Sequence, residues 1–262
     1  MSLYYELRGK NIVAAAKHLL EAGVLEMRHS DGKLQSPGFK NTWQTPWVHH
    51  RLSYRHNCYM WKDVVFENII TQVLPKEKWF VPRCCQNCFK VVVRPQSVKQ
   101  LFELAEIQRI LNYASKAGIE IRPSVFGNYG GYFYNRGLSE GLDCYKVVRN
   151  VIDAQIGNIP VILKRGCTEM EHGVGPSTLW KVTPEQVAFE ELIEQKFVMD
   201  VPVVGQSPHA KDYVKQMWIE KAYEWGDPTV FEYLDPNNPL YPPYETYHNL
   251  EKERDPILFR KF

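Results

Sequence analysis

The sequence predicts an α+β fold with a ferredoxin-like βαββαβ core, and three observations in its middle third support this prediction. Two amphipathic helix patterns, at residues 98–117 and 140–156, alternate with four short segments rich in β-branched and aromatic residues. Each helix pattern begins after a serine that can cap it and ends at a glycine. The order strand, helix, strand, turn, strand, helix, strand is that of the ferredoxin-like motif.

The four core strands are expected at residues 89–94, 119–125, 132–134 and 159–164. The glycine-rich residues 128–131 read as the turn between the second strand and the third. In this topology the first and fourth strands are adjacent and antiparallel. The start of the first strand therefore lies beside the end of the fourth.

The segments on either side of the core are expected to be helical extensions. Helix patterns cover residues 11–22, 61–74, 183–197 and 210–225, and no periodic pattern covers residues 27–59. The predicted division is therefore residues 1–81 for an N-terminal helix and an aromatic, His-rich loop region, 82–180 for the core with its Cys cluster, and 181–262 for a helical extension with a Pro/Tyr-rich tail.

The composition is typical of a soluble globular protein. The chain has 262 residues, of which 44% are hydrophobic and 24% charged, and its formal net charge is +2. No apolar run is long enough to cross a membrane, and no basic start followed by an apolar block indicates a secretory leader. We therefore expect a cytoplasmic location, where clustered cysteines are more often metal-binding or reactive than disulfide-bonded.

The cysteines form the most informative pattern. Cys84, Cys85 and Cys88 directly precede the first core strand, and Cys167 follows the fourth. Because those two strands are expected to be antiparallel neighbours, the fold should bring Cys167 to the Cys-x-x-Cys pair formed by Cys85 and Cys88. Parallel strands would instead place Cys167 at the far end of the sheet, roughly 17–20 Å away.

A cluster of this kind predicts a metal site. Cys85, Cys88 and Cys167 supply three thiolate ligands, and the fourth ligand stays open between Cys84, Cys58, His56 and His172. The cofactor is zinc or an iron–sulfur cluster, because the same thiolates bind either one. The alternative without a cofactor is a group of buried, inert thiols.

A second hypothesis is a module that binds single-stranded nucleic acid and uses the metal structurally. Tyr132 and Tyr134 should point to one face of the third strand, where aromatic side chains of such sheets stack on bases. Arg94 and Arg136 lie near the same strand ends and could contact phosphates.

Two further hypotheses concern catalysis and assembly. Cys167 could act as a nucleophile with His172 as its base, so whether the chain is an enzyme is left open. The Pro- and Tyr-rich tail at residues 236–262 could dock on a protein partner. The sequence contains no glycine-rich phosphate loop, dinucleotide fingerprint or serine nucleophile elbow.

Overall fold

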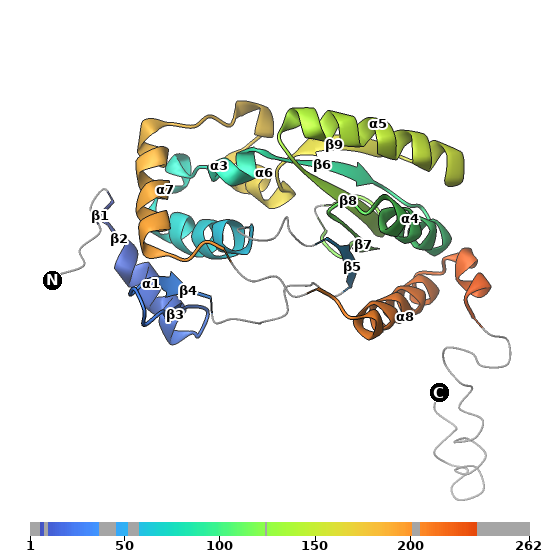
Figure 1. Cartoon of the computed structure of the whole chain (residues 1–262), viewed down its shortest axis with the longest axis horizontal. Helices are drawn as coiled ribbons and strands as arrows, with labels where there is room; N and C mark the ends of the chain where they lie inside the picture. The colour runs from blue at the N-terminus through green and yellow to red at the C-terminus, as the bar shows by residue number, and fades with distance from the viewer. Residues whose placement is uncertain are drawn as a thin grey trace, which may run out of the picture.

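The chain folds around a five-stranded antiparallel sheet with the strand order β5-β7-β8-β6-β9 (Figure 1). A computed structural model describes residues 6–7, 10–36, 46–51, 58–123, 125–200 and 205–234. The five strands are β5 (Trp47–His50), β6 (Cys88–Val93), β7 (Ser115–Ile119), β8 (Tyr129–Arg136) and β9 (Val161–Arg165). Each neighbouring pair is antiparallel, including β6 with β9.

Two long helices pack against one face of this sheet (Figure 1). They are α4 (Val98–Leu111) and α5 (Leu138–Gln155), and the chain runs β6-α4-β7-β8-α5-β9. The side chains of Val91, Val93 and Phe133 pack against these helices and form a buried core with them. The α+β class is thereby confirmed. The ferredoxin-like assignment stays a prediction, since β5 adds a fifth strand beside β7.

The predicted boundaries around β7 are wrong. The helix expected over residues 98–117 ends at Leu111, because Asn112 adopts a left-handed conformation with φ 52° and its N–H bonds to the carbonyl of Gln108. Asparagine tolerates this conformation, which stops a helix. Residues 115–117 therefore form part of β7, and the strand expected at 119–125 begins four residues earlier.

The turn predicted at residues 128–131 is also wrong, because β8 already begins at Tyr129. Its glycines serve close packing. A β-carbon on Gly131 would lie 2.3 Å from the side chain of Leu104, and one on Gly130 would lie 2.8 Å from Nη1 of Arg94. Glycine in a strand interior often marks such an approach by a neighbouring group.

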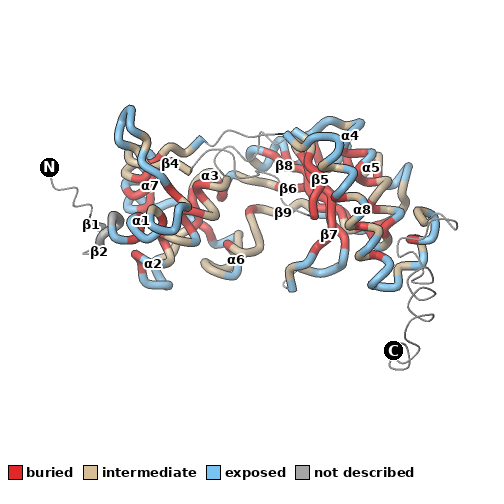
Figure 2. Tube along the Cα trace, turned by 90° about the horizontal axis from the view of Figure 1, so that it is seen from below, coloured by how far each residue is buried: buried red, intermediate tan, exposed pale blue. Residues whose placement is uncertain are grey.

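Helices from both ends of the chain form a second body beside the sheet (Figure 2). This helical body contains α1 (Ile12–Glu21), η2 (Tyr59–Ile70, a helix of wide π-type turns), α2 (Thr71–Val73), α6 (Thr168–Val174) and α7 (Pro184–Lys196). Met60, Ile69, Met170 and Phe189 are fully buried in its core. The helical extensions before and after the sheet thus share one hydrophobic core.

The remaining elements are short, apart from one helix. They are β1 (Glu6–Leu7), β2 (Lys10–Asn11), β3 (Glu26–Met27), β4 (Leu34–Gln35), η3 (Lys76–Lys78), α3 (Arg83–Gln86), η4 (Ser177–Leu179), α8 (Pro208–Glu224) and η5 (Pro228–Glu232). The long helix α8 packs beside β5, where the indole N–H of Trp218 donates to the carbonyl of Pro46 at 2.8 Å.

In the described part of the chain, no helix has both the length and the apolar character that crossing a bilayer requires. The tail at residues 236–262, predicted to dock on a partner, lies outside the described residues.

Candidate functional site

A cavity of about 350 Å³ lies where the helical body meets the sheet, and cysteines line it. Five of the six cysteines contribute to its wall: Cys58, Cys84, Cys85, Cys88 and Cys167. They come from the start of η2, from α3, from the first residue of β6 and from the residue before α6. The sixth, Cys144, lies in α5 and packs in the core on the opposite face of the sheet.

The short helix α3 is held in place from two sides. The backbone N–H and Nε of Arg83 both donate to the carboxylate of Glu190 on α7, at 2.9 and 2.6 Å. The guanidinium of Arg165, at the end of β9, donates to the carbonyl of Gln86 at 2.7 Å. These contacts anchor α3 between the helical body and the sheet, and so position the thiols of Cys84 and Cys85, which lie 3.8 Å apart.

The antiparallel pairing of β6 and β9 brings Cys167 to the other cysteines. Phe89 is opposite Arg165 in the register, and the N–H of Gly166 donates to the carbonyl of Cys88 at 2.8 Å. Gly166 has φ +64°, and the ring of Trp180 lies 2.5 Å from where its β-carbon would be. Only glycine fits this turn without strain. Cys85, Cys88 and Cys167 therefore lie at the same edge of the sheet and line one cavity.

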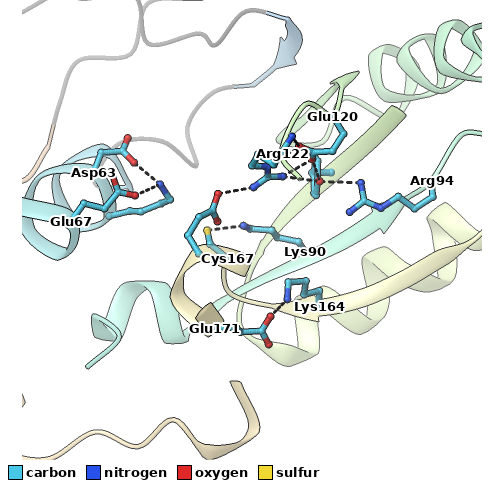
Figure 3. A network of polar contacts seen from close by, with 12 residues as sticks. Asp63, Glu67, Lys90, Arg94, Glu120, Arg122, Lys164, Cys167 and Glu171 are labelled. Carbon is cyan, nitrogen blue, oxygen red and sulfur yellow. Dashed lines mark hydrogen bonds and ion pairs between the residues drawn. The ribbon is translucent and has the colours of Figure 1, made fainter. Parts of the chain in front are cut away.

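Lys90 connects the sheet to the cysteine group. Its ammonium group donates to Sγ of Cys167 at 2.8 Å (Figure 3), although the side chain is only 8% exposed. Burial lowers the pKa of Lys90, but the negative charge of Cys167 and Cys88 in their thiolate forms, together with the hydrogen bond to Cys167, outweighs this effect and leaves the pKa raised. Lys90 therefore carries a positive charge beside the thiols.

Two of the thiols are held in the protonated form. The neighbouring thiol of Cys84, followed by burial, raises the pKa of Cys85, and burial raises the pKa of Cys88 to about 12. A metal ion would have to displace these protons as it bound. Within the ranges that the structure describes, no three His, Cys, Asp or Glu side chains lie close enough together to hold a metal ion.

The sheet face that borders the cavity carries cations and aromatic rings. Lys90 is paired across the strands with Tyr134 and Lys164, and Lys116 with Tyr132. Side chains paired in this way share one face of a sheet. The ammonium group of Lys116 also lies 4.1 Å above the ring of Trp47.

A charged network surrounds the hydroxyl group of Tyr132, and Figure 3 shows its charged members Arg94, Glu120 and Arg122. Arg94 and Arg122 each donate to this hydroxyl at 3.1 Å, and the hydroxyl donates to Glu120 at 2.8 Å. Arg122 also pairs with Glu120 at 2.5 Å and with Glu169 at 2.7 Å. The network thus connects β7 and β8 to α6.

Ion pairing keeps both carboxylates of this network charged. Burial raises the pKa of Glu120 and of Glu169, but hydrogen bonds and the charge of Arg122 outweigh it. The net result is a lowered pKa for Glu120 and a pKa of about 2 for Glu169.

Several residues singled out in the sequence lie away from this cavity. His172 is exposed on α6 and Arg136 is exposed at the end of β8, and neither lines the cavity. The segment after Cys167, which carries His172, is the helix α6. His56 lies outside the described residues.

The aromatic residues proposed for base stacking do line the cavity, as does Arg94. Tyr132, however, is only 6% exposed and is held by the hydrogen bonds above. In this conformation its ring is packed against Trp47, with centroids 5.5 Å apart, and is not free to stack on a base. Nucleic-acid binding stays a prediction.

Sequence reasoning missed Lys90, Lys116 and Glu120. For Lys90 a signal exists, because it is a lone charge directly before three consecutive valines in a strand that reads as buried. For Lys116 no such signal is present, since the helix predicted over residues 98–117 includes it, and Glu120 falls at an ordinary alternating position of the strand predicted at residues 119–125. No family model, curated protein or solved structure matches this chain.

Proposed function

We propose that this protein binds an iron–sulfur cluster through the cysteines of the cavity. One observation carries the proposal: five of the six cysteines, from segments far apart in the sequence, line one cavity. Cysteines without a shared role would be expected in separate hydrophobic cores of the protein. Cys85, Cys88 and Cys167 are the central ligands of the proposed site, and Cys84 and Cys58 are the candidates for the fourth.

The number of thiols and the size of the cavity favour a cluster over a single zinc ion. Tetrahedral zinc holds its sulfur ligands at about 2.3 Å, which brings the sulfur atoms to roughly 3.8 Å from one another and leaves no space between them. A cavity of about 350 Å³ lined by five thiols suits a larger group. The charge of Lys90 supports the same choice, because it would offset the negative charge of a thiolate-bound cluster.

The proposal includes a reducing, cytoplasmic environment. All six cysteines are free thiols, and the sulfur atoms of Cys84 and Cys85, which lie 3.8 Å apart, belong to adjacent residues. Thiols persist in a reducing compartment, whereas an oxidising one favours disulfides. The cluster would then join η2, α3, β6 and α6 at the boundary between the two bodies.

The test is metal analysis of protein purified without oxygen. Iron, acid-labile sulfide and zinc are measured together with the visible absorption spectrum. Cys85→Ala, Cys88→Ala and Cys167→Ala should each lose the metal and the visible band. Cys144→Ala is the matched control, because it removes the one cysteine that packs on the opposite face of the sheet, and it should keep both.

Three outcomes are distinguished. Iron and sulfide that are lost in the three cavity variants support the proposal. Zinc at about one ion per chain, lost in the same variants, would replace the cluster by a structural zinc site. Protein without either metal, in all samples and after reconstitution with iron and sulfide, would refute metal binding.

A second candidate, a thiol enzyme using Cys167, is favoured by one contact. The ammonium group of Lys90 beside Sγ is the electropositive surrounding typical of reactive cysteines, whereas His172 lies outside the cavity. In metal-free protein, Cys167 should then be alkylated much faster than Cys84. Equal rates at the two thiols would count against this function.

A further inference from the structure

The two edges of the sheet differ in what covers them. We infer that β9, the edge strand beside α5 (Figure 1), pairs antiparallel with β9 of a second copy of this chain, so that the two sheets become one. We call the outer side of β9 (Val161–Arg165), together with Leu138 and Leu142 of α5, the edge surface. It contains no cysteine, so the inference stands independently of the metal proposal.

The backbone groups of β9 point alternately toward β6 and toward the outer edge. The N–H of Gly166 donates to the carbonyl of Cys88 at 2.8 Å. At the other end of the strand, the N–H of Arg94 donates to the carbonyl of Pro160 at 3.0 Å. Such bonds recur at every second residue of an antiparallel ladder. The residues whose N–H and C=O groups point outward are therefore Val161, Leu163 and Arg165.

These outward groups form no hydrogen bond with any residue that the structure describes. β9 is the last strand in the sheet order and pairs only with β6 among the described strands. A row of unpaired N–H and C=O groups at a sheet edge is a template for another strand. The outer edge of β9 can therefore accept one.

The opposite edge of the sheet, at β5, is covered. The side-chain amide of Gln206 accepts a hydrogen bond from the N–H of His49 at 2.7 Å and donates one to the carbonyl of Trp47 at 2.8 Å. It occupies backbone groups that a neighbouring strand would use, and α8 packs beside the same strand. Covering an edge in this way prevents further strands from pairing there.

Exposed apolar side chains lie next to the open edge. Leu138, Leu142 and Arg149 are separated by four and seven residues, so they share one side of α5. Arg149 donates to the carbonyl of Ile159, just before β9, at 2.7 Å, and this side of the helix therefore borders the strand. Leu138 and Leu142 are 52% and 44% exposed, and Ile162 on β9 is 51% exposed. Pairing with a second copy would bury them.

The residue types along β9 suit pairing with a second copy. If the twofold axis passes at Leu163, this leucine lies opposite the partner's Leu163. Ile162 then lies opposite the partner's Lys164, and Val161 lies opposite the partner's Arg165. The outward groups of the two strands face each other in this register, as a ladder requires. No like charges are directly opposite, which would destabilise the pair.

The two cations of β9 do not obstruct the edge. Lysine on an edge strand often prevents pairing with another chain. Here, however, the ammonium group of Lys164 pairs with Glu171 of the same chain. The guanidinium of Arg165 donates to the carbonyls of Gln86 and Ser177, at 2.7 and 3.0 Å. Both side chains are thus held by their own chain.

The covered edge at β5 favours a second copy that completes a closed dimer. In a twofold dimer both copies use the same surface, so each β9 edge is fully occupied by the other. A contact between β9 of one copy and β5 of the next would displace Gln206 and would leave an open edge at each end. The antiparallel β9 pair therefore ends the assembly at two chains.

Light scattering after size-exclusion chromatography, over a range of protein concentrations in reducing buffer, tests the inference. The unmodified protein should reach twice its chain mass of 30.6 kDa. Ile162→Lys and Leu142→Lys should each weaken the dimer by about tenfold or more, because each replaces an apolar contact that occurs twice in the interface. Ile110→Lys is the matched control, since it changes an exposed isoleucine of α4, and it should leave the dimer intact.

The charge of the substitution tests the register. Ile162→Glu places a carboxylate opposite the partner's Lys164, whereas Ile162→Lys places a second cation there. Ile162→Glu should therefore weaken the dimer less than Ile162→Lys does. Equal weakening by both substitutions would overturn the register centred on Leu163.

Hydrogen exchange locates the contact on the strand. The backbone N–H of Leu163 should be protected in the dimer and should exchange faster in Ile162→Lys. Thermal melts confirm that each variant is folded. A monomer at every concentration, or equal dimer stability in Ile162→Lys, Leu142→Lys and Ile110→Lys, would overturn the inference. A monomer in which the Leu163 N–H is protected would overturn it as well, because another segment of the chain would then cover the edge.

Metal content measured on the same samples separates this inference from the metal proposal. Ile162→Lys should lose the dimer and keep the metal, whereas Cys167→Ala should lose the metal and keep the dimer.

Discussion

The ammonium group of Lys90 donates a hydrogen bond of 2.8 Å to the sulfur of Cys167, although the two residues are 77 positions apart in the chain. This contact joins the middle of β6 to the residue before α6, at the boundary between the sheet and the helical body. It places a buried positive charge directly on a proposed metal ligand. Hydrogen bonds and charges at such sulfurs set the properties of the metal they hold.

The first prediction concerns this contact. If the proposed cluster is bound, Lys90→Met should keep it but shift its midpoint potential to a more negative value, because the reduced cluster would gain one negative charge without the nearby cation that stabilises it. Redox titration of the visible band measures the shift. Lys99→Met removes a lysine that pairs with Glu232 on the exterior and should leave the potential unchanged. Equal potentials in the two variants would show that Lys90 has no part in the site.

The second prediction concerns metal loading. Since a metal would tie η2, α3, β6 and α6 together, the loaded protein should be more stable than the metal-free protein. Binding at a hundredfold excess over the dissociation constant contributes about 2.7 kcal/mol, or roughly 5–10 °C in Tm for a chain of this size. Calorimetric melts before and after chelation measure the difference. Cys144→Ala should show the same difference, and Cys88→Ala should show none.

The third prediction concerns the turn that brings Cys167 to the cavity. Gly166→Ala places a β-carbon in a left-handed conformation and against the ring of Trp180. We expect unfolding free energy to fall by more than about 2 kcal/mol and metal content to drop sharply. Gly226→Ala is the control, because Gly226 has a similar φ of +70° and open space around it. It should be destabilised by only about 1 kcal/mol and retain its metal. Equal effects of the two substitutions would contradict the role assigned to Gly166.

The fourth prediction concerns the anchor of α3. The carboxylate of Glu190, with a side chain 2% exposed, accepts hydrogen bonds from the backbone N–H and Nε of Arg83 and from Nε2 of Gln186. Glu190→Ala leaves these donors without their acceptor and should lower the unfolding free energy by about 2–4 kcal/mol. Glu191→Ala, one residue further on the exposed side of α7, should change it by less than about 0.5 kcal/mol. Urea unfolding measures both, and a small effect at Glu190 would show that α3 is held by other contacts.

The fifth prediction concerns pH. Burial raises the pKa of Asp227, but hydrogen bonds from Tyr129, Thr229 and the N–H of Val98 outweigh it, so that the pKa is lower in the folded chain than in the unfolded chain. A carboxyl group of this kind contributes stability above its unfolded pKa of about 3.9, and the contribution is lost as the pH falls through the folded pKa. The stability advantage over Asp227→Asn should therefore be constant near neutral pH and shrink in acid. Urea unfolding of both proteins from about pH 7 to about pH 2 checks this, and an advantage independent of pH would contradict it.

Local patterns in the sequence were sufficient for much of the fold. The apolar periodicity and the capping residues Ser97 and Thr183 locate α4 and α7, since a helix and its caps depend on residues within a few positions. Cys85 and Cys88 lie at the start of one strand and Cys167 lies after the end of another. Because these two strands pair antiparallel, the three residues lie at one edge of the sheet.

Tertiary structure alone decided the rest. β5 has four residues and no local sequence pattern that predicts a strand. It is a strand because its backbone pairs with β7. The participation of Cys58, Lys90 and Lys116 in one cavity follows from the packing of the helical body against the sheet. Contacts between residues far apart in the chain determine that packing, and no short window of sequence contains them. The sequence by itself therefore determined the class of the fold and the sheet edge that the three cysteines share, whereas the cations beside them depend on how the two bodies pack.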